Sequence, residues 1–334
     1  MSILNSPITI NGLALKNRLV MPPMATSKAA QGGAVTGGLC AYYAERAAGG
    51  CIGLIVTEHC FISPEGRAHA GQLSIASDAD VPGLRRLTDT IHAHGSKAMA
   101  QISHAGGAAQ PGYPGLRALS PSGVRLPRDS GEGPAPDAMA EADIEKVIRD
   151  FAAAARRAKA AGYDGVELHS AHGYLLNQFF SPLTNRRADR YAGGTLEGRT
   201  RLHCEILRAV RAAVGAEYPV AVRFGACDYM AGGSTEADAA EAAALLEAAG
   251  ADLLDISGGL CGYRNPQSRA PGYFGAAAEA VRQRVSVPVL LTGGVTAADE
   301  AEALLERGCA DLIGEGRALL KDTGWARSAL GGER

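Results

Sequence analysis

Two histidines and a tyrosine lie close together in the segment HSAHGY, where His169, His172 and Tyr174 follow the apolar run DGVEL. Imidazole and phenol groups exchange protons and hydrogen bonds, so this segment is the first candidate for chemistry. A metal site is a poor alternative, because His-x-x-His without a nearby third ligand is unsuitable spacing for zinc. A purely structural histidine cluster is the other alternative. The run before His169 predicts a buried strand, which places the group where a strand gives way to a loop.

Gln101 and Arg223 each lie within another run that predicts a buried strand. An amide both donates and accepts hydrogen bonds and a guanidinium is permanently charged, so the pair could hold a planar heterocycle. A buried, unpaired guanidinium is costly, and Arg223 therefore needs an anionic or electron-rich partner. The alternative is an ion pair with a carboxylate of the protein such as Glu167.

Glycines follow the last two predicted strands, at Gly293, Gly294 and Gly316, and Arg317 comes next at the start of a short predicted helix. Glycine lets backbone N–H groups approach an anion, the helix dipole favours negative charge, and arginine can pair with it. Ordinary turn glycines are the alternative for each position alone. Together, after strands seven and eight, they predict a site for a phosphate group.

Eight short runs rich in Val, Ile and Leu alternate with longer amphipathic segments. The runs cover residues 18–23, 52–58, 97–103, 164–170, 219–225, 252–258, 287–293 and 311–316. Helical patterns at 40–50, 80–95, 141–162, 234–250 and 296–308 end in Gly, and most begin with a capping or acidic residue. This alternation predicts an α/β fold, a (β/α)8 TIM barrel, as a single domain over residues 1–334. An open doubly wound sheet is the alternative, but no G-x-G-x-x-G follows the first strand.

The connections indicate which end of the barrel carries a site. Asn-Gly within PITINGLALKNR predicts a β-hairpin, expected as a lid on the N-terminal face. Three long connections rich in Gly and Pro, residues 104–140, 171–194 and 259–275, follow strands three, four and six. Because barrel active sites lie at the C-terminal ends of the strands, we expect these loops to cover one.

Composition excludes several classes of protein. The chain has 334 residues, 46 % of them hydrophobic, and a formal net charge of −2, so no basic excess predicts nucleic-acid or membrane-surface binding. The N-terminus lacks signal-peptide character and no apolar run reaches about 18 residues, so a cytoplasmic protein is expected. The seven cysteines form no C-x-x-C pair and are expected to be reduced thiols, with no metal bound.

Several motifs resemble one family along nearly the whole chain, from about residue 7 to 325. The string GVELHSAHGYLLNQFFSPLTNRRADRY, with TLEGRTRLHCEI after it, resembles the signature of the Old Yellow Enzyme family of FMN-dependent ene-reductases and NADH:flavin oxidoreductases. LKNRLVMPPMAT, HGSKAMAQISHAG and ADLIGEGRALLKD are similar to that family's first, third and eighth strands.

The resemblance implies tightly but non-covalently bound FMN and NAD(P)H as the reductant. It implies that Pro23, Met24 and Ala25 lie against the flavin, that Gln101 binds its pyrimidine edge and that Arg223 supports its N1/O2 end. It further implies that the phosphate is held by Gly293, Gly294, Gly316 and Arg317. His169 and His172 would bind the substrate oxygen, and Tyr174 would donate the proton. Two imidazole N–H donors aimed at an oxygen that gains charge act as an oxyanion hole does, which agrees with these roles.

The sequence departs from the family pattern at Ala25, at His59 and in RYAGGTLEGR, which carries one residue more than the common form. Ala25 stands where many relatives have Cys or Thr, with Thr26 next, and either residue is a candidate flavin contact. His59 stands after Glu58 where small residues are usual, and it is assigned to the cofactor site as a residue that either contacts the ring or points away. Longer relatives continue into a cysteine-rich cluster and a nucleotide-binding domain. We expect NAD(P)H here to reduce the same flavin that reduces the substrate.

The predicted function is an FMN-dependent ene-reductase. NAD(P)H would reduce FMN, which would pass hydride from N5 to an activated C=C bond of an α,β-unsaturated carbonyl or nitro compound, with protonation by Tyr174. Alternatives are a flavoprotein NAD(P)H oxidase or diaphorase without alkene turnover, and a 2,4-dienoyl-CoA reductase-like activity. A Schiff-base aldolase would need a lysine at the C-terminal end of a strand, whereas Lys97 begins its strand. The expected partners are a small-molecule substrate and further copies of the chain, as a dimer or tetramer.

Overall fold

The computed structural model describes residues 2–110, 116–129 and 134–331. Eight parallel strands close into a barrel in which each strand pairs with the next along the chain. They are β3 (Leu19–Met21), β4 (Leu54–Phe61), β5 (Lys97–Ser103), β8 (Gly165–Ser170), β9 (Val220–Cys227), β10 (Leu253–Gly258), β11 (Val289–Thr292) and β12 (Leu312–Gly314). All eight correspond to predicted runs, so the (β/α)8 barrel is confirmed and the open sheet is wrong.

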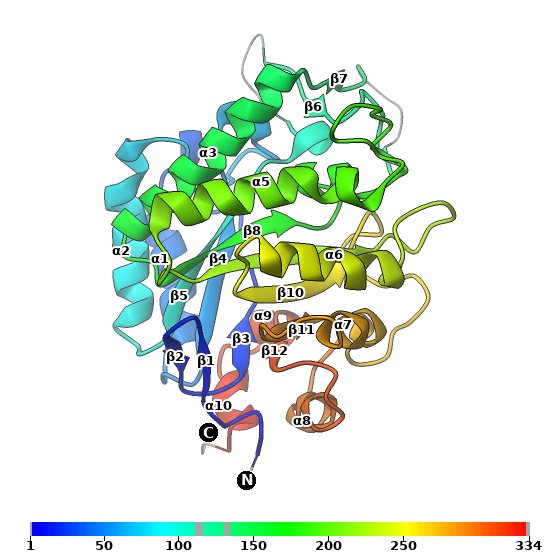
Figure 1. Ribbon diagram of the computed structural model, residues 1–334. Helices are drawn as coiled ribbons and strands as arrows, with labels where there is room; N and C mark the ends of the chain where they lie inside the picture. Colours follow the sequence, from blue (N-terminus) through cyan, green and yellow to red (C-terminus); the bar gives the residue numbers. More distant parts are fainter. Residues whose placement is uncertain (1, 111–115, 130–133, 332–334) are drawn as a thin grey trace.

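Helices surround the barrel (Figure 1). The five predicted helices are α1 (Gly37–Ala47), α2 (Val81–His92), α3 (Glu141–Ala160), α6 (Glu236–Ala248) and α8 (Ala298–Glu306). Other helices escaped prediction: α4 (Leu175–Phe180), α5 (Leu196–Val214), α7 (Gly275–Arg282) and α10 (Trp325–Ala329). The short helix expected at Arg317 is α9 (Arg317–Lys321). The predicted loop 171–194 is therefore wrong in part, since α4 lies within it.

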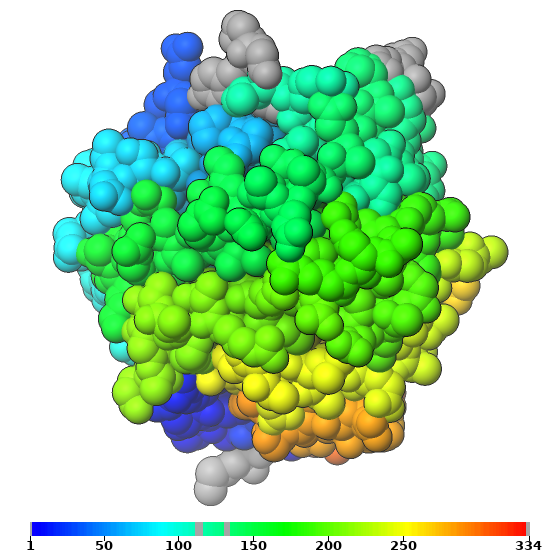
Figure 2. Space-filling view, turned by 45° about the horizontal axis from the view of Figure 1, so that its top comes forward, coloured from blue at the N-terminus to red at the C-terminus, as the bar shows by residue number. Residues whose placement is uncertain are grey.

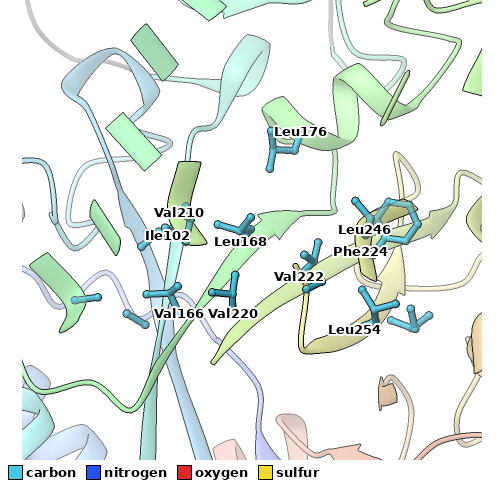
Figure 3. Close-up of a cluster of buried hydrophobic side chains, with 14 of the residues drawn as sticks. Ile102, Val166, Leu168, Leu176, Val210, Val220, Val222, Phe224, Leu246 and Leu254 are labelled. Atoms are coloured by element: carbon cyan, nitrogen blue, oxygen red, sulfur yellow. The ribbon is translucent and has the colours of Figure 1, made fainter. Parts of the chain in front are cut away.

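The strands covered by α4, α5 and α6 show why their sequences are nearly continuous apolar runs. Outward residues of neighbouring strands, such as Val166, Val222 and Leu254, pack against Val210 of α5 and Leu246 of α6 in one buried cluster (Figure 3). Every second residue points the other way, into the barrel. The two faces of each strand are therefore buried in different surroundings.

The inward residues at the N-terminal end of the barrel are apolar. Leu54, Met99, Leu253 and Leu312 form a second buried cluster there. The antiparallel hairpin β1 (Ile8–Ile10) and β2 (Leu13–Leu15) adds Ile10 and Leu15 to this cluster, so it closes that end of the barrel as predicted. Apolar side chains therefore fill this end, and the inward polar residues Gln101 and Arg223 lie nearer the opposite end.

The long connections at the C-terminal end pack on each other. The connection after β5 contains the short parallel pair β6 (Leu119–Ser120) and β7 (Asp137–Ala138), while its residues 111–115 and 130–133 lie outside the described chain. Arg187, in the connection after β8, donates to the carbonyl oxygens of Pro121 and Met139 at 2.8 and 2.7 Å. Figure 2 shows the teal residues after β5 beside the green residues after β8 on this side of the molecule.

The hairpin gives a direct test of the closed N-terminal end. Leu15→Ala removes a fully buried side chain from the apolar cluster, and we expect the free energy of unfolding to fall by about 2–5 kcal/mol. Urea denaturation followed by circular dichroism measures the change. Thr9→Ala, on the exposed side of the same hairpin, is the control and should change it by less than about 0.5 kcal/mol. Equal effects of the two substitutions would show that the hairpin does not close the barrel.

Candidate active site

A buried polar layer replaces the apolar one toward the C-terminal end of the barrel. Strand register places Gln101 beside Glu167, and Arg223 beside Asp255. The Gln101 Nε2 donates to the Glu167 Oε1 at 2.8 Å, and the Arg223 Nη1 lies 3.2 Å from the Asp255 Oδ2. Arg223 lies in the middle of β9, not at its end, because this strand continues to Cys227. Its ion pair is with Asp255, and the proposed pairing with Glu167 is not the one observed.

This layer keeps hydrogen-bonding groups without partners. Within the described chain, the Arg223 Nε and Nη1, the Glu167 Oε2 and the Asp255 Oδ2 are buried and form no hydrogen bond. The Arg223–Asp255 contact is thus close enough for an ion pair but is not aligned for hydrogen bonding. Leaving such groups unsatisfied costs about 1–3 kcal/mol each. The layer therefore suits a planar ligand that offers acceptors to the guanidinium.

Burial also changes the charges of the layer. Desolvation, reinforced by the negative charge of Asp255, raises the pKa of Glu167 to about 8, so its carboxyl group is mostly protonated at neutral pH. Desolvation raises the pKa of Asp255 as well, while the Arg223 guanidinium opposes this rise. The positive charge of Arg223 is consequently balanced by no more than one carboxylate.

Above the layer, three predicted site residues come together with His59. The ring centroids of His169 and Tyr174 are 4.8 Å apart, and those of His169 and His172 are 5.2 Å apart. His59, from β4, lies 5.4 Å from Tyr174 and 6.0 Å from His169. Residues from two strands and the turn after β8 thus form one cluster of rings.

The turn after β8 holds His172 in an unusual backbone conformation. Its φ is 58°, in the left-handed region that non-glycine residues seldom adopt, which is typical of functional sites. The His172 N–H donates to the carbonyl oxygen of Gly258 at 3.2 Å, and the Arg128 Nη2 donates to the His172 carbonyl oxygen at 2.7 Å. The ring Nε2 lies 2.8 Å from the Ser257 Oγ. Contacts from the end of β10 and from the connection after β5 therefore stabilise this conformation.

The ring cluster is uncharged. Desolvation lowers the pKa of His169 and of His172 well below the ordinary value, and neighbouring positive charge, including that of Arg223, lowers both further. Desolvation raises the pKa of Tyr174 to about 12. Across the physiological range the imidazoles are therefore neutral, and the phenol keeps its proton.

The residues predicted to hold a phosphate follow the adjacent strands β11 and β12. Gly293 and Gly294 have φ values of 146° and 80°, and a Cβ on either would come within 2.6 Å of the Tyr273 ring. A Cβ on Gly316 would come within 2.9 Å of the Met24 Sδ. The Arg317 guanidinium carbon lies 6.0 Å from the centroid of Tyr273. Glycine is thus required for close packing here, and Tyr273 is a neighbour that the sequence did not single out.

The residues after β3 divide between the barrel and the surface. Pro23, Met24 and Thr26 are half-buried, whereas Ala25 is exposed. Desolvation raises the pKa of Glu58 to about 7, and hydrogen bonds from Thr26 oppose that rise. Thr26 therefore connects this segment to β4, next to His59.

Comparisons with known proteins agree with this geometry. A model of the NADH:flavin oxidoreductase / NADH oxidase family matches residues 4–332. An NADH oxidase of Thermoanaerobacter brockii is 39% identical over 97% of this chain and 50% of its own length. An NADPH dehydrogenase of Halalkalibacterium halodurans is 38% identical over 97% of this chain and 93% of its own length. The solved Old Yellow Enzyme homologue of Zymomonas mobilis superposes with a TM-score of 0.84 at 29% identity, covering 97% of this chain and 91% of that one.

The fold is a (β/α)8 barrel with a buried polar layer, and the matches indicate a flavin-dependent oxidoreductase. The chain belongs to the NADH:flavin oxidoreductase / NADH oxidase family, and it is similar in structure to an Old Yellow Enzyme homologue. The family model and these matches agree with the predicted FMN cofactor, NAD(P)H reductant and class of enzyme. The chain spans about half the length of two of the curated relatives that it matches, the Thermoanaerobacter protein among them.

Other predicted features can be located within the described residues. Lys97 lies at the start of β5, and its Nζ is 3.0 Å from the Asp164 Oδ1, far along the strand from the ring cluster. In the described part of the chain, no group of three or more His, Cys, Asp or Glu side chains is arranged to hold a metal ion. No helix there is long and apolar enough to cross a membrane.

Sequence reasoning missed three residues that hold the site together. Gln72 lies in the connection after β4 and binds His59, Arg128 binds the turn at His172, and Tyr273 packs on the glycines after β11. All three lie in irregular connections, where no periodicity indicates which way a side chain points. The pairings of Arg223 with Asp255 and of His172 with Ser257 were also not predicted.

The buried carboxyl of Glu167 makes stability depend on pH. In the unfolded chain its pKa is about 4.5, and burial raises it to about 8. As the pH rises through this window the unfolded state loses the proton first, so the free energy of unfolding declines. Glu167→Gln removes this titration, and urea denaturation at about pH 5 and pH 8 should show a smaller decline. Part of the decline of stability with pH should remain in this variant, because burial also raises the pKa values of Glu58 and Glu315 to about 7.

Glu197→Gln is the control, because this side chain is 79% exposed. It should leave the slope of stability against pH as in the wild type. A Glu167→Gln variant with the wild-type slope would show that Glu167 is already ionised in the folded protein.

Proposed function

We propose that this chain is an FMN-dependent ene-reductase that uses NAD(P)H to reduce an activated C=C bond of an α,β-unsaturated carbonyl or nitro compound. The observation that carries the proposal is the convergence of His169, His172 and Tyr174 above a buried layer with unsatisfied Arg223 donors. The site combines neutral hydrogen-bond donors, a protonated phenol and a place for a planar acceptor-rich ring.

The residues present fit FMN. Gln101 would bind the pyrimidine edge of its ring and Arg223 the end where negative charge gathers, while Pro23, Met24, Ala25 and Thr26 would lie beside it. Gly293, Gly294, Gly316 and Arg317 would hold the phosphate. Two observations favour this assignment: the buried Arg223 nitrogens without partners and the glycines where a Cβ would not fit. When bound, FMN supplies the hydride chemistry.

The chain's own residues would position the substrate and manage its charge. His169 and His172 would donate to the substrate oxygen, which becomes negative when hydride adds to the β-carbon, and neutral imidazoles suit this role because they donate without charge. Tyr174 would then give its proton to the α-carbon as a general acid. The elevated pKa of Tyr174 keeps that proton in place until a strongly basic carbon forms.

Two further proposals concern the wider protein. NAD(P)H would bind over the same flavin as the substrate, so that the two half-reactions alternate in one site of a single domain spanning residues 1–334. The substrate would be a small molecule, with no nucleic acid or membrane involved, and copies of the chain would associate as a dimer or tetramer in the cytoplasm.

Spectroscopy and turnover test the proposed function directly. We expect the purified protein to carry an oxidised-flavin spectrum, to be bleached by NAD(P)H without oxygen, and to recover its colour with 2-cyclohexenone. A protein that stays colourless after FMN is added would refute the proposal. Reduction by NAD(P)H without reoxidation by the enone would instead indicate an NAD(P)H oxidase or diaphorase, and reoxidation by dienoyl-CoA alone would indicate a dienoyl-CoA reductase.

Tyr174→Phe tests the proton donor. The substitution retains the ring packing against His169 but removes the phenol proton, so reoxidation of the flavin by 2-cyclohexenone should slow by about 10²–10⁴-fold. Stopped-flow absorbance of the pre-reduced enzyme measures this step. Tyr218→Phe, at a tyrosine that lies just before β9 at the N-terminal end of the barrel, is the control. An enone step that keeps its wild-type rate in Tyr174→Phe would mean that the proton comes from elsewhere.

A further inference from the structure

His59 owes its position to an irregularity of β4. Thr57 pairs with Ala100 of β5 and Cys60 pairs with Ile102, so that both Glu58 and His59 lie opposite Gln101. One extra residue on one strand is a β-bulge, which re-aims a side chain and is frequent next to active sites. Here the bulge brings His59 to the ring cluster, edge-on to Tyr174.

Hydrogen bonds fix the tautomer of His59. The Ala68 N–H donates to the Gln72 Oε1 at 2.7 Å, and the Gln72 Nε2 donates to the His59 carbonyl oxygen at 3.1 Å. These two backbone groups set the orientation of the amide. The Gln72 Nε2 also lies 2.6 Å from the His59 Nδ1, so the amide must donate and the Nδ1 must accept. The proton of the imidazole therefore resides on Nε2.

That N–H is free for a ligand. Within the described chain the His59 Nε2 has no hydrogen-bond partner. Unlike the fully buried atoms without partners, this nitrogen keeps some exposure. Desolvation lowers the pKa of His59 to about 3, with a smaller contribution from His69, so the ring is a neutral donor. His169 and Tyr174 are its neighbours on the open side, at ring distances of 6.0 and 5.4 Å.

We propose that His59 forms a second acceptor subsite, in which its Nε2–H binds a second oxygen of the group that activates the substrate alkene. The site would therefore favour nitroalkenes over enones with a single carbonyl oxygen. Gln72 is the positioning residue, since it holds the tautomer that presents the N–H. This proposal rests on the proposed function and names the substrate class of that same site.

The chemistry of a nitroalkene matches two separate groups of donors. When hydride adds to the β-carbon, the electron pair of the C=C bond moves onto the nitro group and its negative charge is shared by two oxygens. The α-carbon then takes the proton of Tyr174, so that the nitro group becomes neutral again and the negative charge passes to the Tyr174 phenolate, which regains a proton from solvent. His169 and His172 can stabilise one oxygen and His59 the other, whereas an enone develops charge on one oxygen alone.

The test compares matched substrates and variants. His59→Phe keeps a ring against Tyr174 without the donor, and Gln72→Glu accepts from the Nδ1–H and so moves the proton away from Nε2. In both variants of the FMN-loaded enzyme, the ratio of kcat/KM for 1-nitrocyclohexene to that for 2-cyclohexenone should fall by about threefold to tenfold. His69→Phe, which changes the neighbouring histidine of the same connection, is the control and should keep the wild-type ratio.

A binding measurement makes the result independent of turnover. Calorimetric titration of the oxidised enzyme with nitrobenzene and benzaldehyde should show the same selective loss for nitrobenzene in His59→Phe and Gln72→Glu. Equal losses for both ligands, or a wild-type ratio, would overturn the proposal and leave His59 as a packing partner of Tyr174. Failure of the wild type to reduce either alkene would refute the proposed function, while the binding ratio would still decide the subsite.

Discussion

The buried Arg223–Asp255 pair is the interaction on which the arrangement of this site depends. A closed barrel sends every second residue of each strand inward, so polar residues at the same height must satisfy one another or a ligand. Asp255 balances the charge of Arg223 but leaves two of its nitrogens without hydrogen bonds. Glu167, protonated by burial, adds no second negative charge. The barrel thereby holds the Arg223 cation in place, and two of its nitrogens remain available to donate to a ligand above the polar layer.

The two ends of the barrel differ for a related reason. The hairpin and the inward Leu and Met side chains fill the N-terminal end, which keeps water from the polar layer and strengthens its electrostatic interactions. At the other end the connections after β5 and β8 are tied together by Arg187. His169 and His172 lie between the packed N-terminal end and the linked loops. This arrangement holds them with the precision that hydrogen bonding to a substrate requires.

The sequence revealed most of the fold because the signals were local. Buried parallel strands are continuous apolar runs, and capping residues and glycines indicated the ends of α3, α6 and α8. Short α4 and α7 offered too few residues for a period, and α5 was noticed only as part of a family motif. The ends of the apolar runs also indicated the site residues that lie at strand ends. The partner of Arg223 was not, because it depends on the register of β9 against β10. The bulge that turns His59 inward likewise depends on pairing between strands, which no single run of residues encodes.

Neutral donors are the consequence of burying the histidines, and the nearby Arg223 guanidinium adds to the effect. A protonated imidazole would bind an oxyanion more strongly, but it would also repel Arg223 and would have to be charged in a desolvated site. Burial and Arg223 both oppose protonation of His169, and the same burial keeps the proton on Tyr174. The cluster therefore does not titrate within the physiological range, and one set of protonation states can serve both halves of a reaction cycle. Apart from the proton that Tyr174 would donate, charge changes in the site are left to the ligands, with Arg223 as the fixed countercharge beneath them.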